Sequence, residues 1–221
     1  MINKKLLAST ALAGLLATSN AFSQTSKFTG PSLALSASHV AGTNEITDNV
    51  YSVDVTTKKN NFILGADINY GFAIGNNFVI GLGATYDFSK TKNGEGTTAI
   101  VYSEDNVYDA TYSNELKDHY SLYIQPTYVI NKDSAMFAKL GRHFAKSTFS
   151  IAIPAVPEPF SESSNIEGWG YGLGFKNFLS DNLFVQGEVV VVDYRENKFA
   201  GGAVLYKPET TNATISVGYK F

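Results

Sequence analysis

Polar and apolar side chains alternate with a period of two through most of this chain, and this pattern narrows the possible folds more than any other feature. Successive side chains leave opposite faces of a β-strand, so the period predicts strands rather than helices. The last ten residues show it most clearly, with Ile215, Val217, Tyr219 and Phe221 on one face and small or polar residues on the other. This final strand therefore presents an apolar face that must be covered by lipid or protein.

The alternation divides into eight runs of roughly nine to thirteen residues, long enough to cross a bilayer when tilted. The runs cover residues 32–40, 62–74, 78–88, 118–130, 136–144, 168–176, 183–194 and 212–221. Polar residues predict tight turns and long loops between them, namely turns at 75–77, 131–133 and 180–182 and loops at 41–60, 90–117, 146–167 and 195–209. Because short and long connections alternate, we predict an all-β fold: an eight-stranded antiparallel up-and-down transmembrane β-barrel with short periplasmic turns and long extracellular loops.

The sizes of the side chains favour a membrane barrel over a soluble β-sandwich or lipocalin-like barrel. The polar faces are rich in Gly, Ser and Thr, which suits a tight lumen, and the apolar faces carry the large aromatic residues. Aromatic residues gather at both ends of the runs, as the two girdles of a membrane barrel do: Phe72, Phe78, Tyr128, Tyr219 and Phe221 on the turn side, and Tyr86, Phe88, Phe144 and Trp169 on the loop side. The outward charges Asp118, Arg142 and Asp193 fall at loop-side ends, and Pro126 within a run predicts a bulge.

The N-terminal 23 residues have the layout of a cleavable secretory signal. Lys4 and Lys5 precede an apolar stretch at residues 6–17, and small residues stand at the predicted cleavage site before Gln24. We therefore expect a signal peptide at residues 1–23 and a barrel domain at residues 24–221. The protein would be exported to the outer membrane of a Gram-negative cell.

Composition excludes several classes of site. The chain has no cysteine, so disulfides and thiolate metal sites are ruled out. Without Lys4 and Lys5 the mature chain has 15 basic and 20 acidic residues, a net charge of −5, which argues against a nucleic-acid partner. We predict neither a cofactor nor a metal.

Several motifs resemble the eight-stranded outer-membrane barrels that include the OmpA transmembrane domain and the opacity-type surface antigens. The motifs are the glycine-aromatic repeat of residues 168–175, the turn at 180–182, the segments 185–188 and 192–194, and residues 137–141. The resemblance implies the barrel architecture, but the family spans adhesins, serum-resistance proteins, structural barrels and a few enzymes. OmpA itself continues into a peptidoglycan-binding domain, and since this sequence stops at Phe221 we expect no such anchor. The terminal Tyr219 and Phe221 resemble the signal by which the barrel assembly machinery recognises such proteins.

Six charged residues are predicted to face the lumen: Asp67, Asp87, Lys139, Lys176, Glu188 and Lys220. Asp67, Lys139 and Glu188 fall at similar depth with opposite signs, which predicts salt bridges that plug the narrow interior of an eight-stranded barrel. In OmpA-like barrels similar pairs are thought to act as a gate, and the resemblance keeps that alternative open here.

His119 and His143 are also predicted to point inward, near Asp87 and the outer mouth. Three such groups on adjacent strands could hold a metal or relay a proton, but simple packing of polar side chains in the lumen is the strongly favoured interpretation. His119 and Ser121 share the His-x-Ser spacing of an outer-membrane lipid A deacylase family. That enzyme needs the pair to face lipid, whereas the alternation turns both inward, so we do not expect an enzyme.

The loops carry the remaining functional signal. Residues 90–117 mix tyrosines with acidic residues, which suits recognition, although this segment could equally extend a hairpin beyond the membrane. We expect a structural or adhesion-type surface protein whose loops contact a host or cell-surface ligand. Its other partners would be outer-membrane lipid and lipopolysaccharide, with Arg142 as a candidate phosphate contact. The alternatives are a narrow porin-like channel and, less favoured, a lipid A-modifying enzyme.

Overall fold

The computed structural model describes residues 25–103 and 106–221, so the predicted signal peptide and its cleavage site before Gln24 lie outside the described residues. The strands and short 3-10 helices follow in this order: η1 Ser26–Phe28, β1 Gly30–Asp48, β2 Val53–Ala73, β3 Phe78–Asp87, β4 Thr91–Ser103, β5 Asn106–Val129, β6 Ser134–Ala152, β7 Phe160–Phe178, β8 Leu183–Tyr194, β9 Asn197–Phe199, η2 Ala200–Gly202 and β10 Val204–Lys220. In the part of the chain described, no helix has the length and hydropathy needed to span a membrane.

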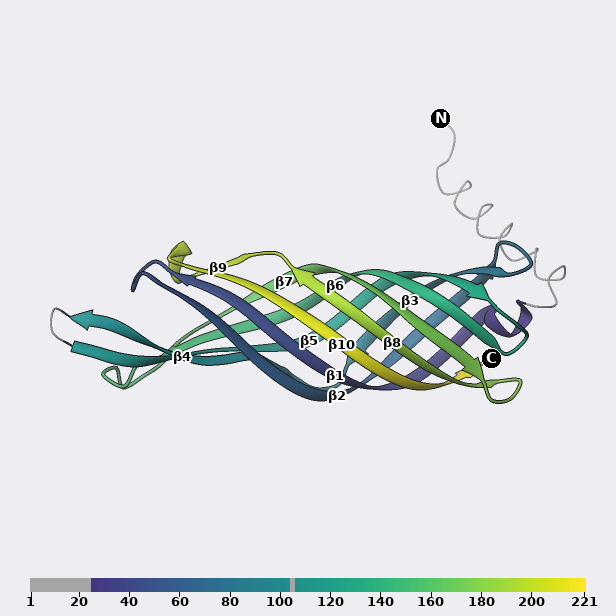
Figure 1. Cartoon of the computed structure of the whole chain (residues 1–221), viewed down its shortest axis with the longest axis horizontal. Coiled ribbons are helices and arrows are strands. Elements are labelled where there is room, and N and C mark those ends of the chain that lie inside the picture. Colours follow the sequence, from purple (N-terminus) through teal and green to yellow (C-terminus); the bar gives the residue numbers. More distant parts are fainter. Residues whose placement is uncertain (1–24, 104–105) are drawn as a thin grey trace, which may run out of the picture.

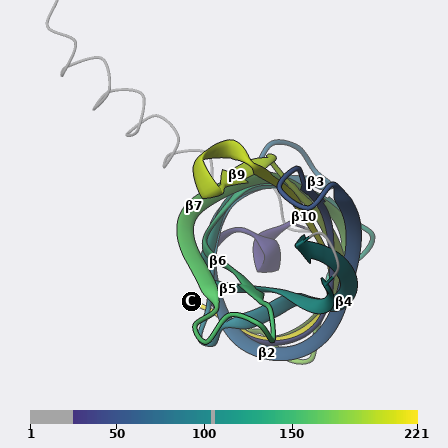
Figure 2. The same cartoon turned by 90° about the vertical axis from the view of Figure 1, so that its left-hand side faces the viewer.

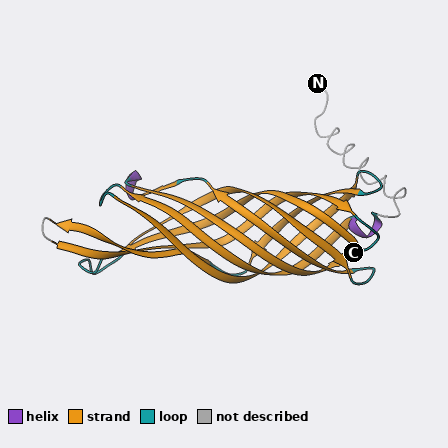
Figure 3. Ribbon diagram, in the orientation of Figure 1, coloured by secondary structure: helices purple, strands orange, loops and turns teal. Residues whose placement is uncertain are grey.

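A closed ring of antiparallel strands forms the body of the protein (Figures 1 and 3). The strand order is β1, β2, β3, β5, β6, β7, β8 and β10, and β10 pairs with β1 to close the ring. β4 continues the line of β3, because both pair with β5. The predicted eight-stranded antiparallel barrel is therefore confirmed, with tight turns at one end.

The strands are longer than a bilayer requires. β5 has 24 residues and β2 has 21, whereas roughly 9–11 suffice for a tilted membrane strand. Much of what the sequence predicts as long loops continues the strands, so that only residues 49–52 join β1 to β2 and residues 153–159 join β6 to β7. These strand ends, with β4, β9 and the connections between them, form a closed extension of the barrel on the extracellular side (left in Figure 1).

The two faces of the sheet exchange character where the extension begins, as β6 illustrates. In the membrane, Met136 and Leu140 face outward and Lys139 is buried inside. Further along the same strand Lys146 faces outward and Phe149 is fully buried inside. Apolar side chains thus face outward in the membrane and inward in the extension, because water replaces lipid on the outside. The period-two alternation itself continues unchanged.

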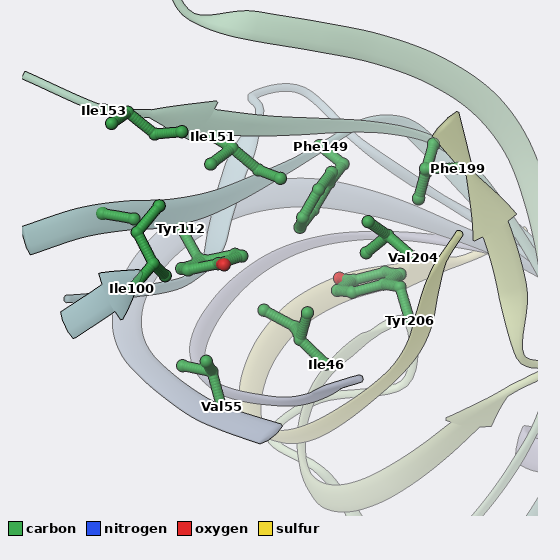
Figure 4. Close-up of a cluster of buried hydrophobic side chains, with 11 residues drawn as sticks. Ile46, Val55, Ile100, Tyr112, Phe149, Ile151, Ile153, Phe199, Val204 and Tyr206 are labelled. Atoms are coloured by element: carbon green, nitrogen blue, oxygen red, sulfur yellow. The ribbon is translucent and has the colours of Figure 1, made fainter. Parts of the chain in front are cut away.

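The extension encloses its own hydrophobic core, shown in Figure 4. This extension core consists of Ile46, Val55, Ile100, Ala110, Tyr112, Phe149, Ile151, Ile153, Phe199, Val204 and Tyr206. The Tyr112 hydroxyl donates a 2.9 Å hydrogen bond to the buried Asp48 carboxylate. Burial and the Asp48 charge raise the pKa of the Tyr112 phenol well above its usual value.

The opposite, periplasmic end is filled by η1, which lies inside the ring in the end-on view of Figure 2. Phe28 from η1 packs edge-on against Phe178, with ring centroids 5.1 Å apart. The other members of this buried cluster are Ala34, Val79, Val129, Ala135 and Phe184. The segment that leads into the first strand therefore acts as a plug.

The bulge predicted at Pro126 was wrong. The β3–β5 register runs through the Ile80–Pro126 pair unbroken, and the β5–β6 register is the same on both sides of Pro126. Pro126 faces outward, and its missing N–H removes a hydrogen bond without inserting a residue. The irregularity lies instead between Lys117 and Tyr120, where Asp118 adopts a φ of 53° that Asp tolerates better than most residues.

We predict that Phe149→Ala destabilises the extension by about 3–5 kcal/mol, because it removes a fully buried ring from the extension core. Amide hydrogen exchange of protein in lipid nanodiscs should accelerate in the ends of β1, β6 and β10 while the membrane part stays protected. Thr148→Ala, on the outer face beside it, is the control and should change little. Equal acceleration throughout the barrel would contradict a separately stabilised extension.

Candidate functional site

A buried lysine lies at the centre of the membrane-level lumen. Lys139 Nζ is 2.7 Å from Glu188 Oε2 and 3.3 Å from Asp67 Oδ2, so β2, β6 and β8 each contribute one charge. The ammonium also lies 4.3 Å from the centre of the Tyr123 ring. The structure thus brings together the three residues that the sequence places at similar depth, and Tyr123 completes this lumen network.

Tyr123 is the member that sequence reasoning did not single out. Its hydroxyl donates to Asp67 at 2.7 Å and accepts from the Asn69 side chain at 3.2 Å. Gly83 on β3 makes room for it, since a Cβ there would overlap the tyrosine ring and hydroxyl. The only signal in the sequence for the position of Tyr123 was therefore indirect: a glycine on the neighbouring strand opposite a large inward side chain.

The other two candidate lumen lysines stand apart from this network. Lys176 is buried with its Nζ 4.4 Å from the centre of the Phe184 ring, closer to the periplasmic plug. Lys220 lies at the periplasmic rim, where its Nζ donates to a main-chain oxygen of the terminal Phe221 at 2.5 Å. Neither lysine forms an ion pair with the side chain of a described residue.

Asp87, His119 and His143 form one hydrogen-bonded chain. Asp87 Oδ2 lies 2.6 Å from His119 Nδ1, and His119 Nε2 lies 3.0 Å from His143 Nδ1, with the two imidazole rings stacked. Gly170 leaves the space that the His143 ring occupies. Residues 25–103 and 106–221 contain no group of three or more His, Cys, Asp or Glu arranged to hold a metal ion.

The His-x-Ser pair faces the lumen. Ser121 is buried, and its hydroxyl lies 2.6 Å from that of Thr85 inside the barrel. His119 is engaged by Asp87 and His143 as described above. The lipid-facing arrangement that a lipid A deacylase would need is absent at this pair.

Further layers fill the lumen above the histidines. Six buried residues form an apolar layer: Leu116, Ala145, Ile166, Val190, Val192 and Tyr194. Above it, Asn44 donates to Thr57 and to the Asn93 carbonyl, and the Tyr206 hydroxyl donates to Asn44 at 2.7 Å. With the periplasmic plug below and the extension core above, buried side chains form successive layers along the interior of the described barrel.

Arg142 faces outward at the extracellular rim of the membrane band. Its guanidinium lies 2.6 Å from Glu167 and 4.9 Å from the centre of the Trp169 ring. Arg195 also contacts Glu167 at 2.6 Å. Arg142 is therefore held by protein partners.

A pair of lysines lies just beyond this rim. Lys117 on β5 stands directly opposite Lys146 on β6, above the stacked rings of Tyr120 and Phe144. Like charges directly opposite each other destabilise a sheet unless an anion lies between them. Neither ammonium forms an ion pair with any described residue.

The C-terminal strand β10 presents its apolar face to the outside. Tyr219 and Phe221 are exposed and pack against each other with ring centroids 5.2 Å apart. β10 pairs with β1 on one side and with β8 on the other, so its backbone groups are hydrogen-bonded within the barrel. Its outward side chains remain exposed.

The β4–β5 hairpin projects beyond the rest of the extension (left in Figures 1 and 3). β4 pairs with β2 only where Glu95 meets Lys58, and β5 pairs with β6 only from Thr111 inward. Residues 97–103 and 106–110 therefore form a two-stranded arm with no further strand beside it in the described part of the chain. Its outer face carries Val101 and Val107, which are paired and each 64% exposed.

The ring, lipid-facing aromatic residues and filled polar lumen define an outer-membrane β-barrel. A family model described as outer membrane protein beta-barrel domain matches residues 8–221, and the chain belongs to this family. No curated protein sequence matches it.

Several solved structures are similar at low sequence identity. Ail of Yersinia pestis, in complex with the heparin analogue sucrose octasulfate, is 17% identical with a TM-score of 0.44, covering 87% of this chain and 99% of that one. OprG of Pseudomonas aeruginosa is 15% identical with a TM-score of 0.47, covering 87% and 96%. The outer membrane protease OmpT of Escherichia coli is 10% identical with a TM-score of 0.48, covering 92% and 100%.

We predict that Lys139→Met destabilises the barrel by about 3–5 kcal/mol, because it leaves the Asp67 and Glu188 carboxylates buried without their cation. Urea unfolding in lipid vesicles measures this loss. The triple variant Lys139→Met, Asp67→Asn, Glu188→Gln removes all three charges and should be more stable than the single variant.

In a planar bilayer the wild-type protein should be electrically silent, and steady openings would contradict a filled lumen.

Proposed function

We propose that this protein is an occluded outer-membrane barrel that acts at the cell surface as an adhesion-type interaction protein. In this proposal a cleaved signal exports the chain, the barrel assembly machinery recognises Tyr219 of β10 and Phe221 directly after it, and the extension binds a partner macromolecule. The projecting arm is the observation that carries the proposal. The filled lumen speaks against the porin-like alternative.

The arm has the properties of a binding edge. An unpaired strand edge offers free backbone N–H and C=O groups to an incoming extended segment. Residues 97–102 on β4 contain no charge, and Thr97, Thr98, Ile100 and Val101 are β-branched residues that favour strand pairing. Natural edge strands usually carry charges that discourage pairing, and this one does not.

We also propose a non-catalytic role. His119 and Ser121, the one pair with a spacing found in an enzyme family, are enclosed in the lumen and engaged by neighbouring side chains. In this proposal the lumen network is a structural plug. The alternative is that its ion pairs act as a gate.

Attachment of bacteria that express the protein tests the adhesion proposal. The surfaces are immobilised fibronectin, immobilised laminin and cultured epithelial cells, and cells without the protein give the background. We expect the wild type to attach above background to at least one surface, and Ala99→Lys to lose most of this attachment, since a lysine on an edge strand disfavours pairing. Thr47→Lys is the matched control, because Thr47 is also exposed but lies on β1, where it pairs with β10 on one side and with β2 on the other. Attachment at background on all three surfaces would overturn the proposal.

The proposed lipid partner is lipopolysaccharide. Arg142 stays in this proposal as a rim contact, and the unpaired Lys117 and Lys146 supply the stronger site, because two cations can share one phosphate. Native mass spectrometry of protein purified from outer membranes should show bound lipopolysaccharide that is lost in Lys117→Gln/Lys146→Gln. Lys132→Gln, in a periplasmic turn, is the control. Unchanged lipopolysaccharide in the double variant would refute the lysine site, and an unchanged amount in Arg142→Ala would refute the arginine contact.

A further inference from the structure

All four extracellular connections meet around one pocket at the outer mouth of the barrel, with a volume of about 420 Å³. The β1–β2 turn contributes Val50 and Tyr51, the arm contributes Tyr102, the β6–β7 connection contributes Val156 and Glu158, and the β8–β10 connection contributes Ala200. Pockets that hold ligands in proteins usually have roughly 300–1,000 Å³. Segments far apart in the sequence thus build one concave site.

The lining of this mouth pocket is apolar apart from two tyrosines and two carboxylates. Ile151, Ile153 and Val204 belong both to the lining and to the extension core, which gives the pocket a fixed floor. Tyr51 stacks on Tyr102 with ring centroids 6.4 Å apart at one wall. A large apolar side chain fits such a surface.

The electrostatic character of the pocket is negative. Asp48 is fully buried, and its carboxylate accepts hydrogen bonds from the Val50 and Tyr51 amides and the Tyr112 hydroxyl, without a cation among the described residues. Glu158 is exposed at the rim and forms no ion pair with a described residue. Lys, Arg and His do not occur in the lining. Burial, followed by the nearby Tyr102 and Asp48, raises the pKa of the Tyr51 phenol.

We propose that the mouth pocket recognises an apolar side chain flanked by basic residues in an extracellular polypeptide. The apolar lining accepts the side chain, and the two carboxylates attract the neighbouring cations. Tyr102 belongs both to the pocket wall and to the open edge of β4, so a segment added to that edge carries its side chains toward the pocket. This inference rests on the proposed adhesion function and names the chemistry of the partner.

Methyl NMR of the full mature protein in lipid nanodiscs tests the pocket with three capped tripeptides: Lys-Trp-Lys, Glu-Trp-Glu and Lys-Ser-Lys. We expect Lys-Trp-Lys to shift the Ile151 and Ile153 methyl signals and to bind about tenfold or more tightly than Lys-Ser-Lys, which lacks the apolar side chain. Glu-Trp-Glu should bind more weakly than Lys-Trp-Lys because its charges face the carboxylates. Equal binding of all three peptides, or no shift of these signals, would overturn the inference.

Matched variants test whether the peptide binds in the mouth pocket. Val50→Arg should abolish binding of Lys-Trp-Lys, and Val107→Arg should not, since Val50 and Val107 are 58% and 64% exposed but only Val50 lines the pocket. Glu158→Gln should weaken binding about two- to fivefold, as expected for a charge at a solvent-exposed rim. Glu45→Gln, an exposed carboxylate on β1 outside the lining, is its control.

The attachment assay separates failure of this inference from failure of the proposed function. Attachment that persists in Val50→Arg and is lost in Ala99→Lys would overturn the pocket as the recognition site while the adhesion function stands. Wild-type attachment at background would overturn the adhesion function, and the peptide titration would still report on the pocket.

Discussion

The bilayer core offers no water to backbone amides, so every N–H and C=O group of a spanning segment must be hydrogen-bonded within the protein. Pairing of β10 with β1 meets this demand, with a continuous register from Ser32–Lys220 to Asp48–Val204. The rest of the structure depends on this closure. It leaves no strand edge in lipid, and it forces each strand to send alternate side chains outward and inward. The open edges lie in the arm, where water can satisfy them.

Closure of so few strands leaves an interior that side chains must fill, and each level does so with different chemistry. Phe28 and its neighbours seal the periplasmic end, Lys139 forms ion pairs with two carboxylates at mid-depth, and Tyr112 and Phe149 belong to the core outside the membrane. These layers of buried side chains favour the proposed occluded barrel over the porin-like alternative. They also give the extracellular connections a rigid base, on which a binding surface loses little conformational entropy.

Much of the barrel could be predicted from the sequence, because lipid outside and a narrow lumen inside impose one pattern on every membrane strand. β8 begins and ends at the residues predicted for the seventh run. The extension was predicted as loops, since its apolar residues, such as Tyr112 and Phe149, are on the inner face and match a soluble barrel. The bulge at Asp118 also shifts the phase of β5, so no single alternation runs along it. The Tyr123 contacts and the Arg142–Glu167 pair depend on which strands are neighbours, and a single sequence does not show that directly.

The change in side-chain character along β6 determines how deeply the barrel lies in the membrane. Phe144 is the last apolar side chain on the outer face before the outward Lys146, Thr148 and Ser150, and the inner face is fully apolar only from Phe149 onward, after the buried Ser147. A shift toward the cell exterior would strip lipid from Leu140 and Phe144, and a shift inward would drag Lys146 and Lys117 into hydrocarbon. Both displacements cost free energy, so the distance by which the mouth stands above the lipid surface is encoded in the strands themselves.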